Sequence, residues 1–260
     1  MKFGLIKTNL SVIQKICLSG LFMALACVLQ KVVAINYLAF APFVRISLGG
    51  PALIIFSSIL LGPIYGLFVG IGSDVLGYFI FDIKANGFFP QITAIYALLG
   101  FVSYFIFSFV FSIRNRRAMK IIEIAFMTVI WIAICLFIIL SKEFKTIGST
   151  VYTLSTLHKV LVCAISGVIF TGIVLLSFLL KPKDNSVYCS PLHICFASFI
   201  CDFFVLVLFG SVMKGFAFGF ETFLAIIICQ SLVMFFNVLI DTLLISAFQR
   251  FSKRYYAERG

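Results

Sequence analysis

Three aspartates lie inside long apolar stretches of the sequence, where an ionised side chain is expensive to bury in lipid. Asp74 lies in the glycine-rich segment GIGSDVLGYF, and Asp241 lies two turns before a basic tail. For Asp74, a structural role, either capping a neighbouring backbone or pairing with Arg45, and contact with a ligand are both open. Asp241 is expected to make a structural polar contact. Asp202, which lies deeper in its apolar stretch, is the better candidate for a binding pocket.

The segment NGFFPQITAIYA, residues 86–97, combines aromatic and amide side chains at the expected start of a helix. Pro90 suits the first helical turn, where its missing N–H would have no partner anyway. Gln91, Thr93 and Tyr96 would then project from the outer end of that helix. Because an amide both donates and accepts hydrogen bonds, Gln91 could read the edge of a heterocycle. Capping of the helix by Asn86 or Gln91 is the alternative.

Signatures of catalysis are absent from the sequence. It contains no G-x-x-x-x-G-K-[ST] for ATP hydrolysis and no G-x-S-x-G nucleophile elbow. His158 and His193 lie in different apolar runs without a local carboxylate, so we expect them to pack between helices or lie at the membrane interface. The 8 cysteines form no C-x-x-C and are expected to act as small hydrophobes. We therefore expect no enzyme, no metal and no cofactor.

The composition is that of a membrane protein. Hydrophobic residues make up 63% of the chain and charged residues 11%, whereas soluble domains carry about 25% charged residues. The net charge of +11 comes from short basic clusters, such as 114–120 and 250–259, that separate apolar runs. Such clusters anchor cytoplasmic loops. Nucleic-acid binding would need a continuous basic face, which the sequence lacks.

The apolar runs predict an all-α polytopic membrane protein with both termini in the cytoplasm. A spanning helix needs about 20 residues. Gly62-Pro63 would break residues 48–82 into a short hairpin, and such broken segments often border transporter binding sites. The predicted spans are 13–33, 48–62, 64–82, 91–113, 121–140, 158–180, 192–212 and 222–249.

Three of the predicted outer loops are rich in aromatic residues: 34–47, 82–90 and 213–221. Aromatic walls with a few polar groups are typical of a small-molecule pocket, and an interfacial aromatic belt is the alternative. In the first span, Gly20 and Ala24 form a stripe of small residues. That stripe could dock a partner helix or pack internally.

Residues 40–111 resemble the S components, the substrate-binding subunits, of energy-coupling-factor vitamin transporters, with the folate type most similar. The resemblance is carried by RISLGGPALIIFSSILLGPIYGLFVGIGSDVLGYFIFD followed by GFFPQITAIYALLGFVSYFIF. In the order that the family shows, these segments hold a basic residue, a G-P turn, a G-x-x-x-D-x-x-G helix and an F-P-x-x-T helix start. Residues 195–249 show a weaker resemblance to the same family, which includes a loop at Lys214-Gly215-Phe216.

The resemblance implies a six-helix subunit, formed by 1–113 and 191–260, that captures folate or a related pterin at the outer face of a bacterial plasma membrane. A transmembrane coupling protein and two ATPases would energise uptake, with Gly20 and Ala24 at the interface. Residues 114–190 would be a two-helix insertion. The stretch AIIICQ at 225–230 lacks basic residues that the folate type carries, which leaves other vitamins open.

The leading hypothesis is thus a vitamin-capture subunit within a single membrane domain, 1–260. An ion-coupled secondary transporter that uses Asp74 and Asp202 is the alternative. An intramembrane enzyme would require Asp74, Asp202 and His193 to cluster. The candidate substrate-binding residues are Arg45, Asn86, Phe89, Gln91, Tyr96 and Asp202.

Overall fold

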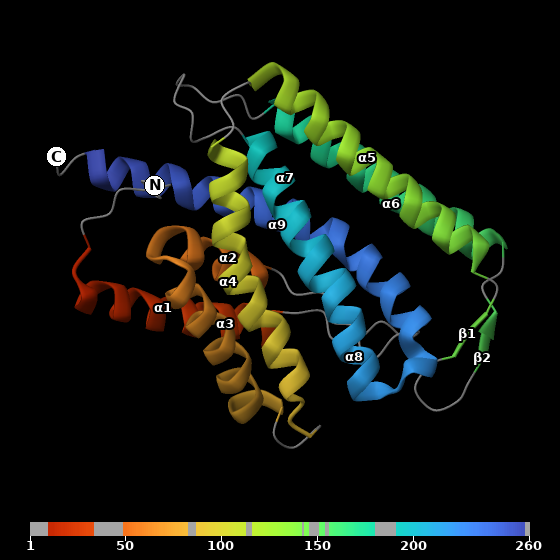
Figure 1. The fold of residues 1–260 in the computed structure, drawn as a ribbon, viewed down its shortest axis with the longest axis horizontal. Coiled ribbons are helices and arrows are strands. Elements are labelled where there is room, and N and C mark those ends of the chain that lie inside the picture. Colours follow the sequence, from red (N-terminus) through yellow and green to blue (C-terminus); the bar gives the residue numbers. More distant parts are fainter. Residues whose placement is uncertain are drawn as a thin grey trace.

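The computed structural model describes residues 10–33, 49–82, 87–112, 116–141, 143–145, 151–153, 156–179 and 191–257. Nearly all of these residues are helical (Figure 1). Of the candidate binding residues, Arg45 and Asn86 lie outside the described residues.

The first half of the chain forms helices that correspond to the first four predicted spans. They are α1 (Val12–Lys31), α2 (Gly50–Leu61), α3 (Pro63–Gly77) with its π-helical continuation η1 (Tyr78–Asp82), and α4 (Pro90–Ser112). Ser11 caps α1 through a reciprocal pair of hydrogen bonds with Gln14. As predicted, α2 and α3 form a short hairpin, and Gly62 at the turn has a φ of 110°, a conformation that favours glycine.

The second half supplies the remaining helical elements and a small β-hairpin. The segments are α5 (Arg116–Leu140), β1 (Glu143–Lys145), β2 (Val151–Thr153), α6 (Thr156–Leu179), α7 (Pro191–Cys201), the π-helix η3 (Asp202–Phe209), α8 (Gly210–Phe218), the 3-10 turn η4 (Phe220–Thr222) and α9 (Phe223–Ala257). The antiparallel pair β1–β2, which the sequence analysis did not predict, connects α5 to α6.

One predicted loop is wrong. Residues 213–221 were expected to form a loop, but α7, η3 and α8 run on as one helical segment to Phe218. Gly215 stays helical, and the helix ends only at Gly219, which has a φ of 96° and donates its N–H to the carbonyl of Gly215. The positive φ of Gly219, rather than the presence of Gly215, therefore sets the boundary.

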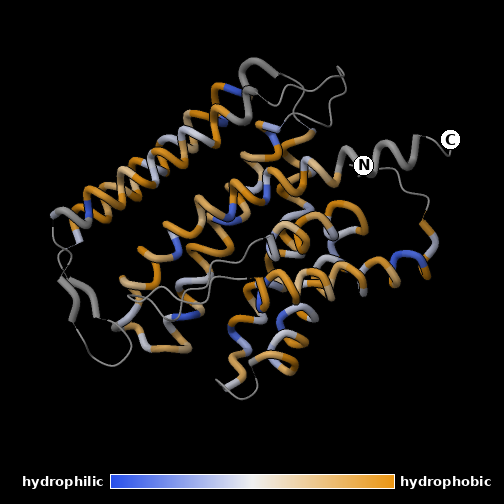
Figure 2. Tube along the Cα trace, turned by 180° about the vertical axis from the view of Figure 1, so that it is seen from behind, coloured by the Kyte–Doolittle hydropathy of each residue, from blue (hydrophilic) through white to orange (hydrophobic). Residues whose placement is uncertain are grey.

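Within the described residues, 6 helices are long and apolar enough to cross a membrane. They are Val12–Lys31, Pro63–Phe81, Pro90–Ser112, Met119–Leu140, Pro191–Phe218 and Phe223–Phe248. Two further apolar stretches, Gly50–Leu61 and Lys159–Leu175 within α6, are shorter. Apolar residues run along the helices and only isolated positions are hydrophilic (Figure 2). The chain is a multi-pass, all-α membrane protein.

Helices α3 and α4 approach each other so closely that their backbones touch. A Cβ added to Gly66 would lie 2.5 Å from the carbonyl oxygen of Gly100, and one added to Gly70 would collide with the carbonyl of Tyr96. Because lipid offers no hydrophobic drive for helix association, such contacts between small residues supply van der Waals packing that larger side chains would prevent. This contact fixes the relative position of α3 and α4 at the level of the candidate site.

Helices α5 and α6 form a hairpin along the flank of α7 and α9 (Figure 1). Trp131 of α5 stacks on Phe170 of α6, with ring centroids 5.7 Å apart, and donates its indole N–H to Ser166. On the other side of the bundle, α1 packs on α2 and α3, which in turn pack on α4. The contacts of α4 with α7 and α8, and those of α2 with α9, join the two groups.

We predict that Gly100→Ala destabilises the protein, because its methyl group would meet the backbone of Gly66. Overpacking of this kind costs about 1–3 kcal/mol. Thermal unfolding of the purified protein in detergent measures the loss. Gly172→Ala on α6 is the matched control, since a Cβ there meets nothing within 4 Å. Equal melting temperatures for both variants would contradict the close backbone contact.

Candidate functional site

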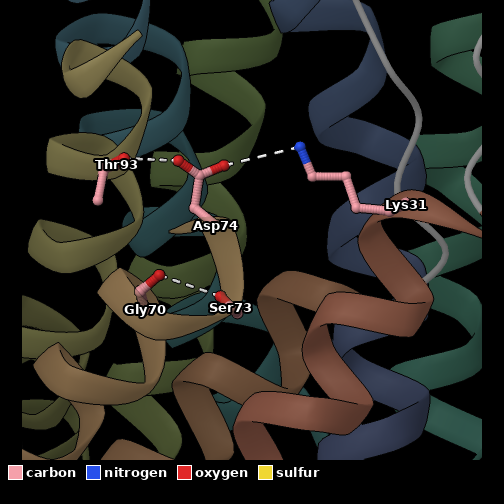
Figure 3. A network of polar contacts seen from close by, with 5 residues as sticks. All are labelled: Lys31, Gly70, Ser73, Asp74 and Thr93. Carbon is pink, nitrogen blue, oxygen red and sulfur yellow. Dashed lines mark hydrogen bonds and ion pairs between the residues drawn. The ribbon is translucent and has the colours of Figure 1, made fainter. Parts of the chain in front are cut away.

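A polar network joins the ends of α1, α3 and α4. The hydroxyl of Thr93 on α4 donates to Oδ2 of Asp74 on α3, at 2.6 Å, and Nζ of Lys31 on α1 lies 3.8 Å from Oδ1 of the same carboxylate. Figure 3 shows Asp74 between its two partners. The three residues come from three helices, so the network fixes one end of the bundle, which we call the site end.

Local packing explains why Lys31 reaches Asp74. A Cβ added to Gly77, one turn after Asp74, would lie 2.7 Å from Cε of Lys31, so the lysine stem crosses α3 at this glycine. The stem is buried along the helix while the ammonium lies at the carboxylate. The exposed fractions of the Lys31 and Asp74 side chains are 12% and 6%, so water screens their charges little.

Aromatic side chains lie at the same end of the bundle. Phe89, just before α4, and Phe218, the last residue of α8, have ring centroids 5.1 Å apart. Tyr78 of η1 and Phe88 are similarly close, at 5.2 Å. The start of α4 is therefore held between η1 and the end of α8.

Gln91 and Tyr96 lie on α4 at the site end, as predicted, and α4 begins at Pro90. Both side chains are at least partly buried. The Oε1 atom of Gln91 is itself buried and accepts no hydrogen bond from the described residues. An acceptor that has lost water without gaining a donor costs about 1–3 kcal/mol. This oxygen is therefore able to accept a hydrogen bond from a ligand at the site end.

Asp202 lies away from this group. It opens η3, four turns before Phe218 on the same continuous helix, or roughly 20 Å. Its side chain is fully buried, and its charge interacts with that of Asp241 on α9. Its contact with a substrate stays a prediction. Asp241 lies near the backbone N–H of Ala52 in the first turn of α2. Neither of its carboxylate oxygens has a hydrogen-bond partner among the described residues, so its structural polar contact stays a prediction.

His193 has a carboxylate partner that the sequence analysis missed. Its Nδ1 contacts Oε1 of Glu123, which lies 70 positions away on α5 and is fully buried. The pair joins the α5–α6 hairpin to α7, so His193 packs between helices as expected.

Asp74, Asp202 and His193 belong to three separate pairings, which gives no support to an intramembrane enzyme. The described residues contain no group of three or more His, Cys, Asp or Glu side chains that could hold a metal ion.

Sequence reasoning also missed Lys31 and Phe218 as members of the site end. Lys31 carried a usable signal, because a basic residue that ends an apolar helix can pair with an acid at the same depth of a neighbouring helix. Phe218 carried none, because its position depends on how far α8 continues.

We predict that Lys31→Met lowers the melting temperature, because it removes the ammonium beside the buried carboxylate of Asp74. Breaking a buried pair costs roughly 3 kcal/mol. Adding Asp74→Asn to this variant should restore part of the loss, because the amide is neutral and its oxygen can still accept from Thr93. Thermal unfolding of both variants in detergent checks this, and a double variant less stable than Lys31→Met would contradict the ion pair.

Comparison with family models, with curated proteins and with solved structures finds no match for this chain. Its function is therefore inferred from its own residues and their arrangement.

Proposed function

We propose that this chain is the substrate-binding subunit of an energy-coupling-factor transporter and captures a vitamin, with folate or a related pterin as the leading ligand. The site end would face outward and both termini would lie in the cytoplasm of a bacterial cell. The observation that carries the proposal is the convergence of α1, α3, α4 and α8 on one polar and aromatic site at the end of a membrane-spanning bundle.

The chemistry at the site end suits a flat heterocycle. The rings of Phe89 and Phe218 offer aromatic faces, and the buried Oε1 of Gln91 can accept a hydrogen bond from a ring N–H. Apolar walls with a few fixed polar groups are typical of small-molecule sites. Tyr96 lies less than two turns from Gln91 on α4 and would extend the contact surface inward.

The exposed face of α1 supports the proposed docking of a coupling protein. Gly20 and Ala24 are exposed, and a Cβ added to Gly20 would meet nothing within 4 Å. Internal packing of the described residues therefore does not require this glycine, unlike Gly66 and Gly70. Leu21 and Val28 of α1 are exposed as well. A small-residue stripe with apolar flanks lets another helix approach closely.

The position of α5 and α6 supports the division into a core and an insertion. Their hairpin lies along the flank of α7 and α9, while α1 to α4, α7 to α8 and α9 form the rest of the bundle (Figure 1). In this proposal, residues 114–190 add two helices to a six-helix core without interrupting it. The sequence has no P-loop, so the proposed ATPases would be separate chains.

We predict that the purified protein binds one molecule of folate or a related vitamin without ATP, as measured by isothermal titration calorimetry. Gln91→Ala should weaken binding by roughly 10-fold, the equivalent of one hydrogen bond. The matched control is Gln14→Ala in the first turn of α1, at the end of that helix away from Lys31, which should leave affinity unchanged.

Two results would contradict this proposal. One is a lack of binding to each of folate, riboflavin, thiamine, biotin and pantothenate. The other is uptake into liposomes that is driven by a sodium or proton gradient without any ATPase, which would favour the ion-coupled carrier.

We predict that Gly20→Leu leaves ligand affinity and melting temperature unchanged but abolishes co-purification of the ATPase subunits. The reason is that the leucine would enter open space in this chain but would keep a partner helix from approaching. Pull-down from the native host, followed by mass spectrometry, measures the partners. Gly172→Leu on α6, also in open space, is the control and should keep them. Loss of partners in both variants would argue against α1 as the interface.

A further inference from the structure

Two buried carboxylates lie on helical elements that pack against each other, η3 and α9. Asp202 opens η3, Asp241 lies on α9, and both residues are 0% exposed. The two side chains are close enough for their charges to influence each other, and both lie within electrostatic range of the Cys201 thiol. None of their four carboxylate oxygens has a hydrogen-bond partner among the described residues.

A third acceptor lies beside the pair. Asn237 precedes Asp241 by one turn on the same face of α9, and helical side chains lean toward the N-terminus, which directs Asp241 toward Asn237. The Asn237 side chain is 6% exposed, and its Oδ1 has no hydrogen-bond partner in the described part of the chain. The group therefore gathers acceptor oxygens that receive no hydrogen bond from the described residues.

Two ionised carboxylates at this depth would be untenable. Each buried charge loses several kcal/mol of hydration, and two like charges repel strongly where the effective dielectric constant is low. The ion pairs found among the described residues, Lys31–Asp74 and Glu123–His193, engage other carboxylates. One positive charge bound between Asp202 and Asp241 would remove the repulsion and supply the missing hydrogen.

We propose that Asp202 and Asp241 form a proton-binding site, in which a proton carried by Asp202 is hydrogen-bonded to the Asp241 carboxylate. Asp241 keeps the negative charge, because it faces the Ala52 N–H at the N-terminus of α2, where the helix dipole favours an anion. The bound proton holds η3 against α9 at the level where α2 begins.

A proton fits this site better than a metal ion. A metal ion needs several ligands in a defined geometry, and no group of three or more His, Cys, Asp or Glu side chains in the described residues could provide them. A proton needs only two oxygens. The site does not depend on the proposed transport function.

The ionisable groups around the pair are few. From the elements packed against η3, α9 contributes Asp241 and Cys229, and α7 contributes His193, Cys195 and Cys201. Lys214 lies three turns along on α8. The ionisable residues of α4 are Tyr96 and Tyr104, and α2 has none. We therefore expect the pH dependence of the pair to be set by the carboxyl groups of Asp202 and Asp241 themselves.

Infrared spectroscopy of the full-length protein tests the site directly. At pH 7.5 we expect the C=O stretching band of a protonated carboxylic acid, which shifts when the aspartate carboxyls are labelled with ¹³C. The band should vanish in Asp202→Asn and persist in Glu123→Gln, the matched control for another buried acid. The wild-type label shift needs no variant, so it holds even if Asp202→Asn fails to fold. Absence of the shifted band, or its persistence in Asp202→Asn, would overturn the proposal.

Thermal unfolding gives a second test. Because the folded protein holds a proton that the unfolded chain releases at neutral pH, the wild-type melting temperature should fall as pH rises from about 6 to about 9. Asp202→Asn should be less sensitive to pH, since its amide donates permanently to Asp241, whereas Asp74→Asn should keep the wild-type dependence. A different result would overturn the proton site. If sodium chloride but not choline chloride raised the wild-type melting temperature, and the carboxylic acid band were absent, the site would bind a metal cation instead.

Discussion

The apolar interior of the bilayer is the constraint on which this structure depends. A buried charge there must find a partner, and each partner found ties two helices together. Asp74 joins α3 to Lys31 of α1 and to Thr93 of α4. Glu123 joins α5 to His193 of α7, and Asp202 of η3 faces Asp241 of α9. The few acidic residues of the spans thus lie at the points where helices far apart in the sequence meet.

Close packing complements these polar contacts. The glycines of α3 and α4 bring the two backbones together, and the Asp74–Thr93 hydrogen bond lies on the same helix pair. A site built on such a pair is held by backbone contact rather than by flexible side chains, which favours a fixed geometry for Gln91 and Phe89. On α1 the small residues face outward, so the same residue type serves internal packing in one helix and leaves an open face on another.

The two acidic centres of the core differ in what surrounds them. Asp74 lies at the site end with a cation and a hydroxyl as partners, an arrangement that organises the ends of three helices. Asp202 and Asp241 lie deeper, and their carboxylate oxygens receive no hydrogen bond from the described residues. The first arrangement suits the support of a ligand site, and the second suits a proton. In the proposed function the first would support a ligand at one end of the bundle, while the proposed proton-binding pair would hold its middle together.

The membrane class, the helical segments and the short α2–α3 hairpin were predictable from the sequence, because apolar runs, Gly62-Pro63 and Pro90 act locally. Phe89, Gln91 and Tyr96 could be placed at the start of α4 for the same reason. The continuation of α8 through Gly215 could not, since a glycine ends a helix only where the backbone adopts a positive φ. The partners of the buried charged side chains could not be predicted either, because the members of each pair are distant in the chain. Only the packing of the helices decides which charged side chains lie at the same depth and on facing sides. The pairs are Lys31 with Asp74, Glu123 with His193, and Asp241 with Asp202.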